Sequence, residues 1–440
     1  MSKRTGRWTL VAAGLLAGLG MGALAPAQEL TERGRQQIRA ILAEKASRTP
    51  AARKLATSLV YAQRESLGQA MVQGLGPLRR VADRARVGGD GTVVVDIRAA
   101  VTDELLQTVA RVGGRVTLAY PSLGAVRARV PVGELETIAS LPEVRSIAPE
   151  QGFLVNTGSQ TSQGDVAHGA ATTRSAYGVD GTGVKVGVLS DGVDSLAARQ
   201  GTGDLPPTCA PVPGPGACVT VVPGQAGSGD EGTAMLEIVH DLAPGAKLTF
   251  ATAVNGDASF AQNILDLKNV HGCDVIVDDI TYFNEGAFQD GVIARAVNTV
   301  KAAGALFFSS AGNSGRKDAG TSGTWEGDFL DSETTIDYFT GTDWESLPIH
   351  SWNGVAGAGS ANANPLTANA PSAISLKWSD PLGAAATDYD VFLMDSGLTT
   401  VFDASIDVQA TTLEPFEILG PGFAGEGLVV VRWSGPAKAL

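Results

Sequence analysis

The residues best suited to chemistry are two adjacent carboxylates, Asp230 and Glu231, near the start of the stretch GDEGTAMLEIVHDLAPGAKLTFATA, residues 229–253. Apolar residues at helical spacing follow them, Pro244-Gly245 ends that pattern, and an apolar strand comes next. A carboxylate at a helix N-terminus is most simply a capping residue, stabilised by free backbone amides and the helix dipole. A catalytic role therefore requires other polar groups at the same place.

Two further stretches supply such groups. VKVGVLSDGVD, residues 184–194, is an apolar strand followed by Asp191, and LFFSSAGNSG, residues 306–315, is a strand followed by Asn313. Parallel strands open their carboxyl ends on one edge of the sheet, where ligands bind. We expect an Asp, a helix-N-terminal Glu and an Asn to converge there.

In this order, the three stretches resemble the subtilase superfamily of serine peptidases. They match its Asp motif, its helix that begins His-Gly-Thr and ends Ala-Pro-Gly-Ala, and its Ala-Gly-Asn turn. The resemblance implies a subtilisin-like α/β fold and acyl transfer to a serine hydroxyl. It also implies that Asn313 donates to the oxyanion, a contribution of about 3 kcal/mol to barrier lowering where such donors have been deleted.

The base departs from the subtilase pattern because Glu231-Gly232-Thr233 stands where the family has His-Gly-Thr. The sedolisins, relatives with the same fold, use a carboxylate there, but their Asp four residues later is Met235 in this chain. His240 lies at the far end of the helix and cannot substitute. We therefore expect Glu231 to be the general base.

The partner of that base is expected to be Asp191, although the family order Asp-Ser-Gly reads Ser190-Asp191-Gly192 here. Two close carboxylates cannot both ionise freely, so activity should favour mildly acidic pH.

The nucleophile has no match in the chain. The only Gly-Thr-Ser ends at Ser322, nine residues after Asn313, and no helix-starting run of small residues follows it. Either the later β-rich segment is an insertion and the nucleophilic serine lies beyond residue 440, or the chain is a non-catalytic relative. Asp278 and Asp279 stand where subtilases line the substrate cleft with Ser-Leu-Gly, which leaves a substrate-binding role and a structural role equally open.

Composition describes an exported globular protein. Of the 440 residues, 44% are hydrophobic and 18% charged, and the net charge of -13 argues against nucleic acid or an anionic membrane as partner. Residues 1–27 have the basic start, short apolar run and Ala-Pro-Ala ending of a signal peptide. We therefore expect a secreted or periplasmic protein without a membrane span.

The three cysteines fit an oxidising compartment. Cys209 and Cys218 bracket a Pro/Gly-rich loop and are expected to form a disulfide, which leaves Cys273 as a free buried thiol. So few Cys and His make a structural zinc site improbable.

The chain divides into several predicted segments after the signal peptide. They are a helical lead-in (28–90), a propeptide-like α+β domain of ferredoxin-like order (91–150), a linker (151–183), an incomplete α/β core with a parallel sheet and helices on both faces (184–340), and an all-β sandwich, inserted or appended (341–440).

No cofactor is certain, but calcium is possible at the acidic residues of the sandwich, although solvated turns explain these residues more simply. They are Asp380, Asp388, Asp390 and Asp395.

The sequence thus predicts a secreted serine endopeptidase with a Glu-Asp variant site, whose partners are a protein or peptide substrate and its own propeptide. The alternative is a secreted pseudoprotease that acts as a binding module through its sandwich.

Overall fold

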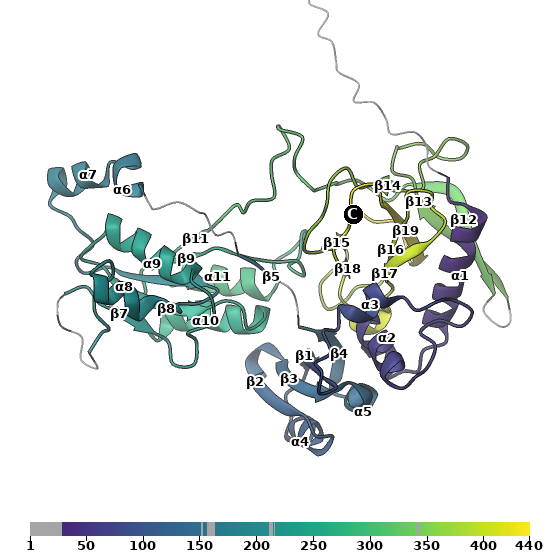
Figure 1. Cartoon of the computed structure of the whole chain (residues 1–440), viewed down its shortest axis with the longest axis horizontal. Helices are drawn as coiled ribbons and strands as arrows, with labels where there is room; N and C mark the ends of the chain where they lie inside the picture. Colours follow the sequence, from purple (N-terminus) through teal and green to yellow (C-terminus); the bar gives the residue numbers. More distant parts are fainter. Residues whose placement is uncertain (1–28, 151–152, 156–162, 211–213, 215, 340–342) are drawn as a thin grey trace, which may run out of the picture.

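The described residues form three units in the computed structural model (Figure 1): an N-terminal part (29–150), an α/β unit (163–330) and a β-rich unit (331–440), called the sandwich below after its predicted architecture. The structure describes residues 29–150, 153–155, 163–210, 214, 216–339 and 343–440. The predicted signal peptide lies outside these residues, as does much of the first half of the predicted linker.

The N-terminal part begins with helices and continues as a small sheet. The helices are α1 (Glu32–Ala46), η1 (Ala52–Lys54), α2 (Thr57–Ser66) and α3 (Arg79–Asp83). They are followed by β1 (Thr92–Ala99), α4 (Asp103–Arg111), β2 (Arg115–Tyr120), η2 (Pro121–Leu123), β3 (Ala125–Pro131), η3 (Val132–Glu134), α5 (Leu135–Ala139) and β4 (Val144–Pro149). The antiparallel strand order is β2-β3-β1-β4, the ferredoxin-like order that the sequence predicts.

The α/β unit contains a five-stranded parallel sheet of order β11-β9-β6-β8-β7. Its strands are β6 (Lys185–Ser190), β7 (Val219–Val221), β8 (Lys247–Thr252), β9 (Val275–Asp278) and β11 (Leu306–Ser309). Its helices are α6 (Gly164–Ala167), α7 (Ala170–Tyr177), α8 (Leu196–Thr202), α9 (Glu231–Leu242), α10 (Asp257–Asn269) and α11 (Val292–Ala302). The segment predicted as a linker therefore carries two helices, α6 and α7.

Helices lie on both faces of this sheet because its strands are apolar on both sides. One core cluster joins the sheet to α10 and α11, and another joins it to α9 through Leu236. A short strand, β10 (Ile280–Tyr282), leaves the parallel sheet and pairs antiparallel with β5 (Phe153–Val155). The disulfide between Cys209 and Cys218 closes the loop before β7, and Cys273 is a free, buried thiol.

The sandwich starts at residue 331, ten residues before the predicted boundary. One sheet has the order β12-β13-β19-β16-β17 with β14 paired to β19, and a two-stranded sheet contains β15 and β18. The elements are β12 (Asp331–Phe339), β13 (Trp344–His350), β14 (Asn364–Pro365), β15 (Ile374–Lys377), β16 (Asp388–Met394), β17 (Val401–Ser405), α12 (Gln409–Thr412), β18 (Phe416–Leu419) and β19 (Gly427–Ser434).

Among the described residues, no helix has the length and apolar character needed to cross a membrane.

Candidate active site

The predicted site residues follow strands whose carboxyl ends share one edge of the parallel sheet. Leu189 of β6 and Ser309 of β11 are both in register with Asp278 of β9. In chain order, β7 and β8 follow β6 on one side of it in the sheet, and β9 and β11 then lie on its other side. The direction of winding therefore reverses between β6 and β9. In open α/β sheets such a switch point is where ligands bind.

The first turn of α9 brings two polar contacts to this edge. The Ser190 hydroxyl, at the end of β6, donates to Glu231 Oε2 at 2.7 Å, and both residues are buried. The backbone amide of Gly232 donates to Asp191 Oδ1 at 3.2 Å. Glu231 and Asp191 therefore meet the same helix turn, where free amides and the helix dipole stabilise negative charge.

Ser190 is a site residue whose role sequence reasoning missed. It occupies the position at which the resemblance expects an Asp, and that offset was the signal available. The structure gives Glu231 this hydroxyl as a hydrogen-bond partner, whereas pairing of Glu231 with Asp191 stays a prediction.

The loop around Asp191 leaves no room for larger residues. Gly229 has φ +114°, a region that favours glycine, and a Cβ built there would overlap the Asp191 carboxylate. Asp230 accepts from the Ser195 backbone amide at 2.7 Å and from its hydroxyl at 2.6 Å, and these bonds lower the pKa of Asp230. Asp230 is thus the structural carboxylate of the adjacent pair.

Asp278 is buried rather than displayed on a cleft surface. It is 3% exposed, and its Oδ1 accepts from the Ser309 hydroxyl at 2.9 Å and from the Ile280 amide at 3.4 Å. Burial raises the pKa of Asp278 to about 7, and the two hydrogen bonds oppose that rise. Asp279 follows it, with its backbone amide directed to the Leu189 carbonyl at 3.4 Å.

Asn313 lies in the exposed turn after β11, on the same edge. The left-handed conformations of this turn fall on Gly312 (φ +69°) and Gly315 (φ +84°), and Asn313 is not among the residues with positive φ. The turn therefore does not require an Asn for its backbone shape.

One half of the sheet face beside α9 is uncovered. Leu306 and Phe308 of β11 are 60% and 56% exposed. They are in register with Val275 and Val277, which pack against the α9-side core. Parallel sheets are ordinarily covered on both faces. We therefore expect another element to cover the open half of the sheet face next to the site.

A segment of the chain itself is held at this edge as an extended strand. Val155 is in register with Ile280 and Phe153 with Tyr282, so β5 runs toward Asp278 and Asp279. Pairing of an extended peptide with an open strand is a common mode of peptide recognition.

Other predicted candidates fall outside this arrangement. Ser322 is in an exposed loop, where its amide donates to the Arg316 carbonyl, and His240 is in the last turn of α9.

The four acids considered for calcium are bound by protein groups. Asp380 accepts from backbone amides and Lys438, Asp388 and Asp390 pair with Lys45, and Asp395 accepts from Thr399 and Thr400. Within the described ranges, no group of three or more His, Cys, Asp or Glu side chains could hold a metal ion.

No protein-family model matches the chain, and no curated protein matches it. Solved structures that resemble it include an enzyme related to subtilisin and a serine protease. One is fervidolysin from Fervidobacterium pennivorans, a keratinolytic enzyme, with 16% identity and a TM-score of 0.30 over 51% of this chain and 40% of that chain. Another is the epidermin leader peptide processing serine protease EpiP from Staphylococcus aureus, with 14% identity and a TM-score of 0.33 over 51% of this chain and 61% of that one. The chain spans less than two thirds of the length of these proteins, and the likeness is too distant to support an argument.

Proposed function

We propose that the chain carries part of the active site of a secreted serine endopeptidase. The observation that supports this most directly is the pairing of β5 with β10, because it holds an extended peptide with its carboxyl end directed toward Asp278 and Asp279. A peptidase must hold its substrate in this way, in reach of its catalytic groups.

In this proposal Glu231 is the general base and Asp191 its partner at the first turn of α9, with Ser190 orienting the Glu231 carboxylate. Asn313 donates to the oxyanion. The nucleophilic serine belongs to an apolar segment that covers Leu306 and Phe308, the open half of the sheet face. Its hydroxyl would lose a proton to Glu231 and attack the scissile carbonyl.

The same proposal also covers maturation and export. Residues 91–150 act as a propeptide, and the peptide bond cut during maturation follows β5. Export is compatible with the disulfide between Cys209 and Cys218, since such bonds persist in oxidising compartments.

The test labels the longest secreted product of the gene with a fluorophosphonate probe at pH 5 and pH 7. We expect labelling, and a new N-terminus between residues 156 and 163. Glu231→Gln should reduce labelling at least 100-fold, within the range of about 10²–10⁴ that general bases contribute. Glu237→Gln, on the same helix, is the matched control and should label normally. A folded product that does not label would exclude catalysis.

A second candidate is a secreted binding module without catalysis. The exposed aromatic pair Phe339 and Trp344, on the β12-β13 hairpin with ring centroids 5.5 Å apart, favours it because exposed aromatic residues often mark interaction sites.

A further inference from the structure

The N-terminal part and the sandwich share one hydrophobic core. Fully buried residues of α1 pack in the same cluster as residues of β12, β13, β16, β17 and β19. Representative members are Ile38, Ile41, Leu42, Ile336, Ile349, Phe392, Ala404 and Val431. Separating the two would return all of this apolar surface to water, at about 25 cal/mol for each Å².

A buried ion cluster crosses the same boundary. Lys45, in the last turn of α1, lies 2.5 Å from Asp388 Oδ1 and 2.7 Å from Asp390 Oδ1 of β16. The three side chains are at most 3% exposed, and the ammonium also lies over the Trp433 ring. A buried ion pair is costly to break because the charge left behind has no partner.

Two more contacts extend this boundary along β17 and the residues that follow it. Thr57, at the start of α2, donates to Asp407 Oδ1 through both its amide and its hydroxyl at 2.7 Å, and its hydroxyl accepts from the Ile406 amide at 3.2 Å. Arg84 forms an ion pair with the buried Asp403 at 2.5 Å.

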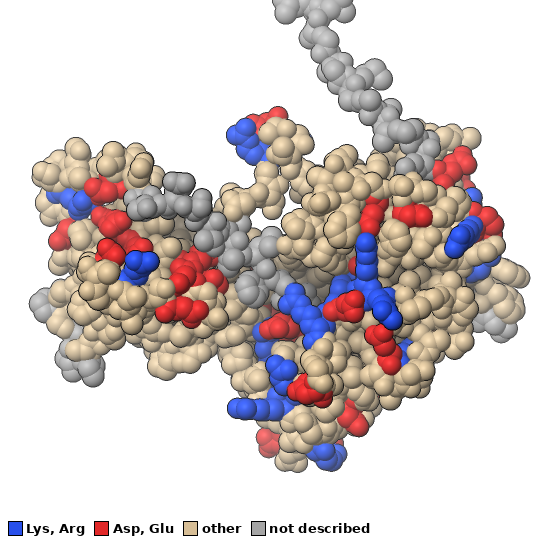
Figure 2. All heavy atoms as spheres, viewed as in Figure 1, with Lys and Arg blue, Asp and Glu red and all other residues tan. Residues whose placement is uncertain are grey.

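The charges of the two sides are complementary. Residues 29–150 contain 18 Lys and Arg against 13 Asp and Glu, whereas residues 331–440 contain 3 against 14. Figure 2 shows blue and red side chains interspersed where the N-terminal part meets the sandwich. A basic segment on an acidic unit favours association.

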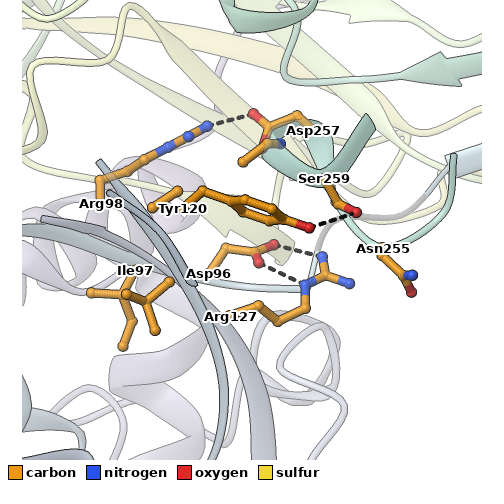
Figure 3. A pocket seen from close by; sticks show the side chains of 12 residues that line it. Asp96, Ile97, Arg98, Tyr120, Arg127, Asn255, Asp257 and Ser259 are labelled. Carbon is orange, nitrogen blue, oxygen red and sulfur yellow. Dashed lines mark hydrogen bonds and ion pairs between the residues drawn. The ribbon is translucent and has the colours of Figure 1, made fainter. Parts of the chain in front are cut away.

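The contact between the N-terminal part and the α/β unit has another character. Figure 3 shows Arg98 directed to Asp257 at the start of α10, and Tyr120 donating to Ser259 at 3.2 Å. These groups surround a small cleft. Partly exposed polar contacts of this kind contribute little and weaken with salt.

We propose that the N-terminal part is a lasting partner of the sandwich, so that a cut after β5 yields a two-chain particle rather than a free propeptide. The N-terminal chain stays bound through the shared core and the Lys45 cluster, and its end keeps the pairing of β5 with β10. Its polar contact with α10 is the one that opens. The inference rests on the proposed function in one respect only: in the natural protein, the proposed peptidase activity makes the cut after β5.

The experiment supplies the cut itself. Residues 156–162 are replaced in the full chain by the seven-residue recognition sequence of a site-specific protease, and the purified protein is digested to completion. We expect both fragments to elute together in size-exclusion chromatography at micromolar concentration in 1 M NaCl, and to separate only in denaturant. An N-terminal fragment that elutes alone would overturn the proposal.

Two variants show which of the two boundaries holds the fragments together. Arg84→Ala, at the sandwich boundary, should speed dissociation of the cut protein at least tenfold. Tyr120→Phe, which removes the hydrogen bond to Ser259 at the α10 boundary, should leave it unchanged. Release by Tyr120→Phe but not by Arg84→Ala would contradict the proposal. Because no step depends on catalysis, failure of the peptidase proposal in the labelling assay is a separate result.

Discussion

The α/β unit and the sandwich both contain buried carboxylates, but the groups that contact these carboxylates differ. In the sandwich, Asp388 and Asp390 face the ammonium of Lys45. At the edge of the α/β sheet, Asp278 faces a hydroxyl and a backbone amide instead. Burial raises the pKa of both Asp278 and Asp390 to about 7, so the two places differ in the cation and not in the pKa. A closed ion cluster holds elements together, whereas a buried carboxyl held by neutral donors next to an open surface is typical of functional sites.

The largest effect should come from breaking the closed cluster. Lys45→Met leaves two buried carboxylates without a cation and is expected to lower the free energy of unfolding by about 3–5 kcal/mol at pH 7. Urea denaturation measures this. Lys54→Met is the control, because the Lys54 ammonium donates to the Leu141 carbonyl near the surface, and it should cost less than about 1.5 kcal/mol. An unchanged midpoint for Lys45→Met would show that the cluster is not ionised.

Asp278→Asn tests the open edge. Folding raises the pKa of Asp278 to about 7, so the folded state binds a proton that the unfolded state releases near pH 4. The stability of the wild-type protein should therefore be full below pH 4 and decline as pH rises to 7. The variant should lack that decline, which is worth at most about 4 kcal/mol.

Unfolding curves for Asp278→Asn at pH 4, 5.5 and 7 check this prediction. Parallel profiles for wild type and variant would contradict it. Ser309→Ala provides a second check, because losing its hydrogen bond should raise the pKa of Asp278 further and extend the decline to higher pH.

The sandwich contains a buried group with the opposite pH response. His350 packs against Trp325, Trp352 and Phe329, and burial lowers its pKa to about 4. The unfolded histidine gains a proton near pH 6.5, so stability should be full above that pH and fall toward pH 4. His350→Phe should remove this loss, at most about 3 kcal/mol.

Thermal unfolding between pH 4 and 7 measures the effect of His350→Phe. His168→Gln, at the exposed position that follows α6, is the control and should keep the wild-type profile. If both variants follow the wild type, acid sensitivity of the sandwich arises elsewhere.

Local patterns predicted the α/β unit better than they predicted its neighbours. Alternating strands and helices indicated the parallel sheet, and polar residues after strands 184–190 and 306–309 indicated the shared edge. The side-chain partner of Glu231 was not predictable, because a one-residue offset decides which of Ser190 and Asp191 meets the Glu231 carboxylate and which meets the Gly232 amide. The joint core of residues 29–90 and the sandwich was also missed. Lys45 and its partners Asp388 and Asp390 are more than 300 residues apart in the sequence. The local pattern on each side indicates only an amphipathic helix or strand and does not show what it packs against.

The smallest effect is expected at the uncovered half of the sheet. Phe308 is 56% exposed, so Phe308→Thr should change the free energy of unfolding by less than about 0.5 kcal/mol. On the opposite face, Phe260→Ala should cost about 3–5 kcal/mol because that ring, carried by α10, is buried in the core between the helix and the sheet. Urea denaturation of both variants compares the two faces. If Phe308→Thr proves as costly as Phe260→Ala, then another element covers this face in solution, and the open edge belongs to a more complete site.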